Sequence, residues 1–295
     1  MNEQTFPIRI IGERINPGFK STRALFDNED IAGIQALAVK QADAGASYLN
    51  VNVGARAHTD PAFMAEVIRA IQAVVSVPLS FDFPSAAVQE ICLKTYDRTR
   101  SGGALPVVNS ITEGRWELMD LFPRLGPFKV IVMASERVED GVAKGNKTGD
   151  EMASTARRAA LRLHREHGLA MDDIFIDLSV SAIVADTAGL NRATLEAIRT
   201  IGADPDLKGI HMMGGLSNIG QQLPAKAADG SDLKFALECA FLTLAVPMAF
   251  DTVLGTPWRG YRPLPDEHHV MANYRHFLEQ SGSNALRAVR KFYRA

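Results

Sequence analysis

Polar side chains that could bind a substrate follow, one after another, the short apolar segments of this 295-residue chain. In chain order they are Glu13, Asn16, Asn50, Asn52, Asp82, Asn109, Ser135, Asp177, Ser217, Asn218 and Asp251. The set consists of carboxylates, amides and hydroxyls, and Arg14 is the nearest cationic side chain. Carboxylates accept hydrogen bonds and amides both donate and accept them, so the set suits a neutral heterocycle with several N–H groups. A phosphate site would instead require Lys, Arg or a glycine-rich backbone nest.

Three other chemistries fit these residues less well. Asp82 and Asp177 could hold Mg²⁺, but they follow the third and sixth apolar segments and would meet only across a ligand. A sugar hydrolase needs paired carboxylates and usually aromatic platforms, whereas Trp116 is better interpreted as a helix anchor. The histidines do not cluster at metal-ligand spacing, and His211 is interpreted as a packed core residue, so no metal site is predicted.

Eight short apolar segments alternate with stretches of helical period. The predicted strands are 8–15, 48–53, 77–83, 105–108, 128–133, 174–177, 209–216 and 246–252. Between them apolar residues recur every three or four positions, as in a helix predicted over 29–44 that Gly45 ends. The clearest helix follows the fifth strand, with Thr148 or Asp150 as its N-cap candidates and Gly168 at its far end.

This alternation predicts parallel β–α–β units. Eight units in a chain of this length predict a single (β/α)₈ TIM barrel spanning residues 1–295. A doubly wound open sheet is less suitable because no G-x-G-x-x-G motif follows the first strand. A basic helix is expected at about 284–295, where it packs on the barrel or, alternatively, docks an acidic partner. The carboxyl ends of barrel strands form one rim, so the polar residues would meet there.

The composition excludes several classes of protein. With 46% hydrophobic and 22% charged residues and a formal net charge of −2, the chain is neither disordered nor a binder of nucleic acid by bulk charge. No uncharged apolar stretch is long enough for a membrane span, and the N-terminus lacks a signal-peptide pattern, so a cytoplasmic protein is expected. Cys92 and Cys239 lie in apolar helical segments and are interpreted as buried small hydrophobes.

Six segments at the predicted rim carry a family resemblance. They read GERIN at 12–16, LNVNVG at 49–54, FDF at 81–83, VVNSI at 107–111, FID at 175–177 and GGLSNIGQ at 214–221. In this order they resemble the pterin-binding, dihydropteroate synthase-like barrel superfamily. More narrowly, they look like its methyltetrahydrofolate:corrinoid-protein methyltransferase branch. The resemblance covers nearly the whole chain.

The resemblance implies a methyltransferase that moves a methyl group between N5 of tetrahydrofolate and the cobalt of a corrinoid (cobalamin). It implies that Asp82, Asn109 and Asp177 hold the pterin ring, and that Asn218 is the catalytic residue that hydrogen-bonds near N5, with Gln221 as a second contact. The other rim residues expected to touch the folate are Glu13, Asn16, Asn52 and Asp251. No segment resembles a corrinoid-binding module, so the corrinoid is expected from a partner protein. The resemblance also implies a homodimer.

Two departures from the family pattern stand in this sequence. The family commonly has Asp where this chain has Asn50, which removes a charge from the rim. The segment at 135–150 is longer than expected, so Ser135, Lys144 and Lys147 receive no role.

Two alternative functions remain open. A dihydropteroate synthase would share the pterin pocket but needs cations to hold a pyrophosphate. Its loop motifs are missing here, although Lys20, Arg23 and Arg56 could supply some charge. The second alternative is a folate-binding subunit without activity of its own.

Overall fold

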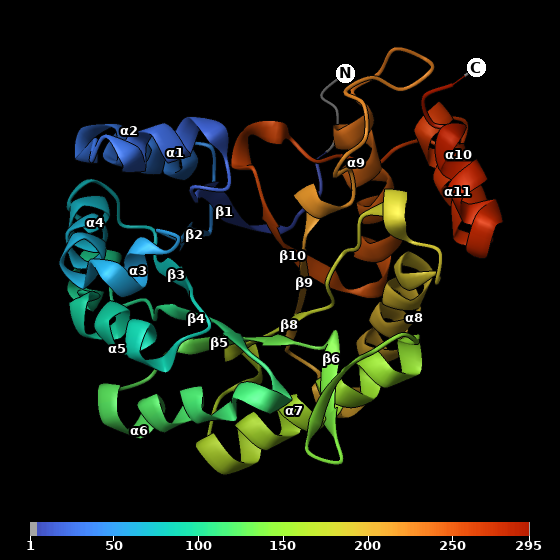
Figure 1. The fold of residues 1–295 in the computed structure, drawn as a ribbon. Coiled ribbons are helices and arrows are strands. Elements are labelled where there is room, and N and C mark those ends of the chain that lie inside the picture. Colours follow the sequence, from blue (N-terminus) through green and yellow to red (C-terminus); the bar gives the residue numbers. More distant parts are fainter. Residues whose placement is uncertain (1–4, 295) are drawn as a thin grey trace.

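Helices surround a closed barrel of eight parallel strands (Figure 1). The structure is a computed structural model that describes residues 5–294. Around the barrel the strands follow the order β1-β10-β9-β8-β5-β4-β3-β2. This closed order confirms the predicted (β/α)₈ TIM barrel. The first four residues and Ala295, which belong to the expected 1–295 domain, lie outside the described residues.

The elements have the following bounds. The barrel strands are β1 (Arg9–Ile15), β2 (Tyr48–Val51), β3 (Leu79–Asp82), β4 (Val107–Ile111), β5 (Lys129–Met133), β8 (Ile174–Asp177), β9 (His211–Gly215) and β10 (Phe250–Gly255). The α-helices are α1 (Lys20–Asp27), α2 (Ile31–Asp43), α3 (Arg56–Thr59), α4 (Pro61–Val74), α5 (Ala86–Thr95), α6 (Phe122–Leu125), α7 (Gly149–His167), α8 (Leu190–Gly202), α9 (Leu233–Ala245), α10 (His269–Leu278) and α11 (Gly282–Arg290). Short 3₁₀ helices, among them Leu216–Asn218 after β9 and Val246–Met248 before β10, complete the loops.

Two apolar layers hold the barrel together. Ile11, Phe175 and Met213 belong to a small buried cluster contributed by inward-facing strand residues. Neighbouring strand positions such as Val130 and Val132 belong to the larger cluster that the helices cover. The two layers follow from the two-residue period of side chains along a strand. They leave the strand ends, where the polar residues lie, as the accessible part of the barrel.

The helix after β5 has the ends that the sequence predicts. Thr148 caps α7 by accepting a hydrogen bond from the backbone N–H of Glu151, and the Glu151 carboxylate accepts from the backbone N–H of Thr148. This reciprocal pair is a capping box, which satisfies N–H groups that the first turn cannot pair internally. At the other end Gly168 adopts a left-handed conformation with φ 70°.

An antiparallel hairpin, β6 (Glu136–Glu139) and β7 (Val142–Gly145), occupies the segment that the sequence assigned to a loop. Asp140 and Gly141 connect its strands, and both have positive φ, of 54° and 76°. An Asp-Gly pair with this geometry is a two-residue hairpin turn, and it is the signal that could have predicted the element. The exposed side chains of Val138 and Val142 show why periodicity missed it, because the hairpin has no buried face.

The C-terminal segment contains two helices. The expected helix at 284–295 corresponds to α11, which begins at Gly282 and ends at Arg290, and α10 precedes it. Ala285, Ala288 and Val289 of α11 are buried in the outer apolar cluster, so this helix packs with the outer layer of helices. Cys92 and Cys239 are both buried free thiols, as predicted. Among residues 5–294, no helix is long and apolar enough to cross a membrane.

Candidate functional site

The carboxyl ends of β2, β3 and β4 bring four predicted site residues into one hydrogen-bonded network. Asp82 is the last residue of β3, and its Oδ2 accepts from Nδ2 of Asn50 and from Nδ2 of Asn52, each at 3.2 Å. Asn109 of β4 donates from Nδ2 to Oδ1 of Asn50, also at 3.2 Å. Parallel register explains the meeting, because Asp82 pairs with Asn109 and Asn50 pairs with Ser80. We call these four residues the mouth network.

Asp177 ends β8 on the same rim. Burial, with a smaller contribution from the nearby charge of Asp82, raises the pKa of Asp177 from its ordinary value of 3.8 to about 6. Its Oδ1 accepts from the backbone N–H of Ser179 at 2.7 Å. Ser179 has a positive φ of 52°, an uncommon conformation for a residue with a side chain. Strained residues of this kind cluster at functional sites.

The carboxyl-terminal rim of the barrel forms its mouth. A cavity of about 360 Å³ lies in this mouth beside the mouth network. Its lining residues are Glu13, Asn16, Gly18, Phe19, Asn50, Gly215, Ser217, Asn218, Gln221 and Leu254. It therefore collects predicted site residues from the ends of β1, β2 and β9. Asn50 both lines this cavity and belongs to the mouth network, so the two halves of the mouth adjoin. Among the described residues, no Lys or Arg lines the cavity.

Glu13 is the carboxylate of this cavity, and it is only 7% exposed. Its Oε2 accepts from the Ser217 hydroxyl at 2.9 Å, and its Oε1 accepts from the Thr256 hydroxyl at 2.8 Å. Burial raises the pKa of Glu13 in spite of these bonds. Both oxygens of Glu13 thus have protein donors.

Asn218 and Gln221 lie at the edge of the cavity and are exposed. Nε2 of Gln221 donates to Oδ1 of Asn218 at 2.7 Å. This bond holds the Asn218 carbonyl, which leaves its amide nitrogen available to a ligand.

Asp251 does not belong to this site, and its expected position on the rim is wrong. It is the second residue of β10, at the amino end of the strand. There its Oδ2 bonds Nη1 of Arg9 and Nδ1 of His211, each at 2.7 Å. The predicted eighth strand began at 246, but 246–248 forms a 3₁₀ helix and β10 ends at Gly255. Because β10 begins and ends later in the chain than predicted, Asp251 lies at the opposite end of the barrel from the rim.

The same shift explains a residue that the sequence analysis missed. Thr256 directly follows β10 and bonds Glu13, so it occupies the rim position that was assigned to Asp251. Gln89 of α5 was also missed. Its Nε2 donates to the backbone carbonyls of Phe81, Phe83 and Asn109, at 2.8, 2.8 and 3.3 Å. Gln89 thereby fixes the ends of β3 and β4, although a buried amide in a helix gives no recognisable signal in one sequence.

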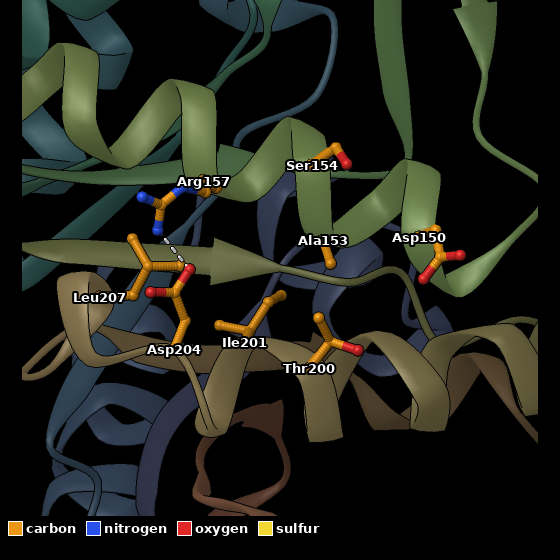
Figure 2. A pocket seen from close by; sticks show the side chains of 8 residues that line it. All are labelled: Asp150, Ala153, Ser154, Arg157, Thr200, Ile201, Asp204 and Leu207. Atoms are coloured by element: carbon orange, nitrogen blue, oxygen red, sulfur yellow. Dashed lines mark hydrogen bonds and ion pairs between the residues drawn. The ribbon is translucent and has the colours of Figure 1, made fainter.

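Other hollows of the described chain offer less chemistry. A cavity of about 180 Å³ lies between α7 and α8, where Figure 2 shows Arg157 turned toward Asp204. Arg157 also pairs with Asp206, so the charges there satisfy one another. A cavity of about 380 Å³ beside the hairpin includes Lys147 and Ser179 in its lining. Within residues 5–294, no group of three or more His, Cys, Asp or Glu is arranged to hold a metal ion.

The chain matches a known family over most of its length. Residues 13–254 match the family described as pterin binding enzyme. The chain is similar to the methylcorrinoid:tetrahydrofolate methyltransferase of Eubacterium limosum, with 26% identity over 253 residues, or 84% of each chain.

Solved structures share the fold. The dihydropteroate synthase of Thermus thermophilus has a TM-score of 0.55 and 20% identity, over 86% of this chain and 90% of that one. The dihydropteroate synthase of Xanthomonas albilineans with 4-aminobenzoic acid has a TM-score of 0.58 and 14% identity, over 86% of this chain and 89% of that one. At these identities the likeness concerns the fold alone.

Proposed function

Because this chain belongs to the pterin-binding enzyme family, we propose that it transfers a methyl group between N5 of tetrahydrofolate and the corrinoid of a partner protein. The observation that carries the proposal is the group of Asp82, Asn109 and Asp177 on one rim. A reduced pterin presents amino and ring N–H groups along one edge, and carboxylate and amide oxygens accept from such donors. The name of the E. limosum relative supports the choice of methyl transfer.

Asn218 is the residue that acts at N5 in this proposal. A methyl group on a tertiary amine leaves poorly unless the nitrogen carries positive charge, and an amine that takes up a methyl group also gains positive charge. In both directions, therefore, a hydrogen bond at N5 must change as the charge changes. The free amide nitrogen of Asn218 can donate to N5, and rotation of the amide can present its oxygen to N5–H instead.

The charge of the mouth favours the same chemistry. Glu13, Asp82 and Asp177 contribute carboxyl groups to the mouth, and no cation lines the cavity among the described residues. Fixed negative groups in a partly desolvated site stabilise positive charge that develops on a substrate. A positively charged N5 would benefit from this field whichever way the methyl group moves.

The methyl donor or acceptor must approach N5 from outside the barrel. Asn218 and Gln221 are exposed, so the proposed N5 position faces the open side of the mouth. A corrinoid presented by a docked partner protein fits this approach, and the chain's own residues then hold and orient the folate. The homodimer and the cytoplasmic location remain predictions, and light scattering of the purified protein tests the first of them.

Cation placement argues against a dihydropteroate synthase. Arg56 already pairs with Glu29 and Asp60, and Arg23 donates from Nε to the backbone carbonyl of Pro17 at 3.0 Å. Of the three cations that could hold a pyrophosphate, only Lys20 has no such bond among the described contacts. A pterin pyrophosphate would therefore meet a mouth dominated by carboxylates.

Methyl transfer to cob(I)alamin tests the proposal. Purified protein with methyltetrahydrofolate should remove the cob(I) absorption band as methylcobalamin forms. Asn218→Ala should lower this rate by about 10- to 100-fold with a smaller change in folate affinity, because it removes a bond that strengthens in the transition state. Asp251→Asn, at the opposite end of the barrel, is the matched control and should keep the rate.

Each negative result points to a different alternative. Folate binding by calorimetry with no methyl transfer, either to cobalamin or to a corrinoid protein, would support the non-catalytic subunit. Turnover of a pterin pyrophosphate with 4-aminobenzoate would support the synthase. Absence of tetrahydrofolate binding would overturn the proposed function.

A further inference from the structure

We propose that Asn50 is a positioning residue that decides which atoms of Asp82 and Asn109 face the substrate. Resting on the proposed function, this inference concerns how the mouth selects a pterin. Asn50 is only 1% exposed and lies between the other two, bonded to Asp82 Oδ2 and to Asn109 Nδ2 at 3.2 Å each.

A backbone group fixes the first amide of the mouth network. The N–H of Gly54 donates to Oδ1 of Asn52 at 2.8 Å, and a backbone N–H can only donate. The other end of the Asn52 amide is therefore its nitrogen, which donates to Asp82 Oδ2. Oδ2 of Asp82 thus accepts from Asn52, and it also accepts from Nδ2 of Asn50.

The constraint then passes through Asn50. Its nitrogen must face Asp82, so its carbonyl oxygen must face Asn109. Asn109 in turn must present its nitrogen to Asn50, which turns Oδ1 of Asn109 toward another partner. Amide ends are assigned from such networks, and here the bonds of Asn50 to Asp82 and to Asn109 agree on one assignment.

The consequence is a rim of acceptors. Within residues 5–294, no protein donor is recorded for Oδ1 of Asp82, Oδ1 of Asn109 or Oδ2 of Asp177. A ligand edge made of N–H and NH₂ groups can satisfy these oxygens, whereas an edge with acceptors at the same positions would leave them unpaired. Asn50 therefore contributes to selecting an aminopyrimidine-type edge by fixing the orientation of these oxygens.

A double-mutant cycle tests whether Asn50 acts through Asn109. Tetrahydrofolate affinity is measured by calorimetry on the full chain for Asn50→Leu, Asn109→Leu and the double variant. Asn50→Leu should weaken binding about 10-fold or more, because Asn109 loses its fixed orientation. In the Asn109→Leu background the same change should cost at least about fivefold less. Asn16→Ala is the matched control, since Asn16 lines the adjoining cavity but bonds the backbone N–H of Gly18 and not the mouth network, and its cost should be the same in both backgrounds.

A second variant separates the two bonds of Asn50 and does not depend on the leucine variants folding. Asn50→Asp keeps an acceptor for Asn109 but faces Asp82 with a second carboxyl group. Among titratable groups, Asp82 on β3 bonds position 50 and Glu13 on β1 lines the same cavity, while Asp177 on β8 interacts with the charge of Asp82. Two adjacent carboxyl groups retain one proton more readily, so folate affinity should be lowest at pH 8 and should recover several-fold by pH 6 relative to wild type.

The outcomes are distinguishable. Equal costs of Asn50→Leu in the two backgrounds, or an Asn50→Asp affinity that follows the wild-type pH profile, would overturn the positioning role while leaving the proposed function intact. A wild-type protein that does not bind tetrahydrofolate would overturn both.

Discussion

Replacing Asp177 with Asn should stabilise the fold at pH 8 and weaken folate binding. Burial raises the pKa of Asp177 from 3.8 to about 6. As the pH rises from 3.8 to about 6, Asp177 loses its proton in the unfolded chain before it does so in the folded chain. The folded state then binds more protons than the unfolded state, so stability falls as pH rises through this window and stays lower above it.

The size of this effect follows from the two pKa values. A carboxyl group with this shift lowers stability by about 3 kcal/mol at pH 8, where it is ionised in both states, and by about 1 kcal/mol at pH 4.5, where it is ionised mainly in the unfolded chain. Asn does not titrate. The stability of Asp177→Asn relative to wild type should therefore rise by about 2 kcal/mol between pH 4.5 and pH 8.

Urea denaturation of both proteins at the two pH values measures this difference. The substitution preserves local geometry, because the Asn oxygen can still accept from the N–H of Ser179. Asp60→Asn is a control of opposite sign, since a hydrogen bond from Arg56 lowers the pKa of Asp60. A stability difference for Asp177→Asn that does not change with pH would refute the argument from burial.

The same variant tests the site. With its oxygen held by Ser179, the Asn amide would present N–H groups to the donor edge of a pterin. Tetrahydrofolate affinity should fall about 10- to 100-fold, because one acceptor is replaced by a donor that has no partner. An unchanged affinity would remove Asp177 from the proposed binding site.

Three further changes test other parts of the molecule. Asp251→Asn should keep tetrahydrofolate affinity within about twofold, and a large loss of affinity would return it to the site. It should cost less than about 1 kcal/mol in stability, since its pair with Arg9 is open to solvent and the Asn side chain retains an oxygen that can bond His211. Gly149→Ala should destabilise the fold by about 1–3 kcal/mol, because an added Cβ would lie 2.6 Å from Cβ of Glu196 where α7 meets α8. An unchanged urea midpoint would contradict that close contact. Thr148→Ala should cost about 1 kcal/mol by removing the cap of α7, and Thr148→Ser, which retains the hydroxyl, should not.

Local signals in the sequence were sufficient for most of the fold. Apolar periods of two and of three to four residues predict the alternation of strands and helices, and the cap residues Thr148 and Gly168 predict both ends of α7. The alternation in turn predicts a barrel, because parallel units of this kind must close or cover both faces of a sheet. The hairpin at 136–145 was missed because it buries no face, although its Asp140-Gly141 turn is a usable signal.

The site was predictable to the extent that it depends on residue type and strand order. Asp82, Asn109 and Asp177 end or nearly end their strands, and parallel strands in a closed barrel deliver such residues to one rim. The prediction was wrong for Asp251, because a shift of a few residues in one strand decides which end of the barrel a side chain reaches. Its partners Arg9 and His211 are far away in sequence and could not be anticipated from the local pattern.

By itself, the sequence determined the order of elements, the barrel class and the chemical character of the rim, since each depends on side chains close together along the chain. Tertiary structure alone decided the register of β10, the bond directions that pass from Gly54 through Asp82 to Asn109, and the burial that raises the pKa of Asp177. These properties arise where strands distant in sequence meet. Hydrogen-bond direction and desolvation depend on what surrounds a group in space, and the neighbours along the chain supply only part of those surroundings.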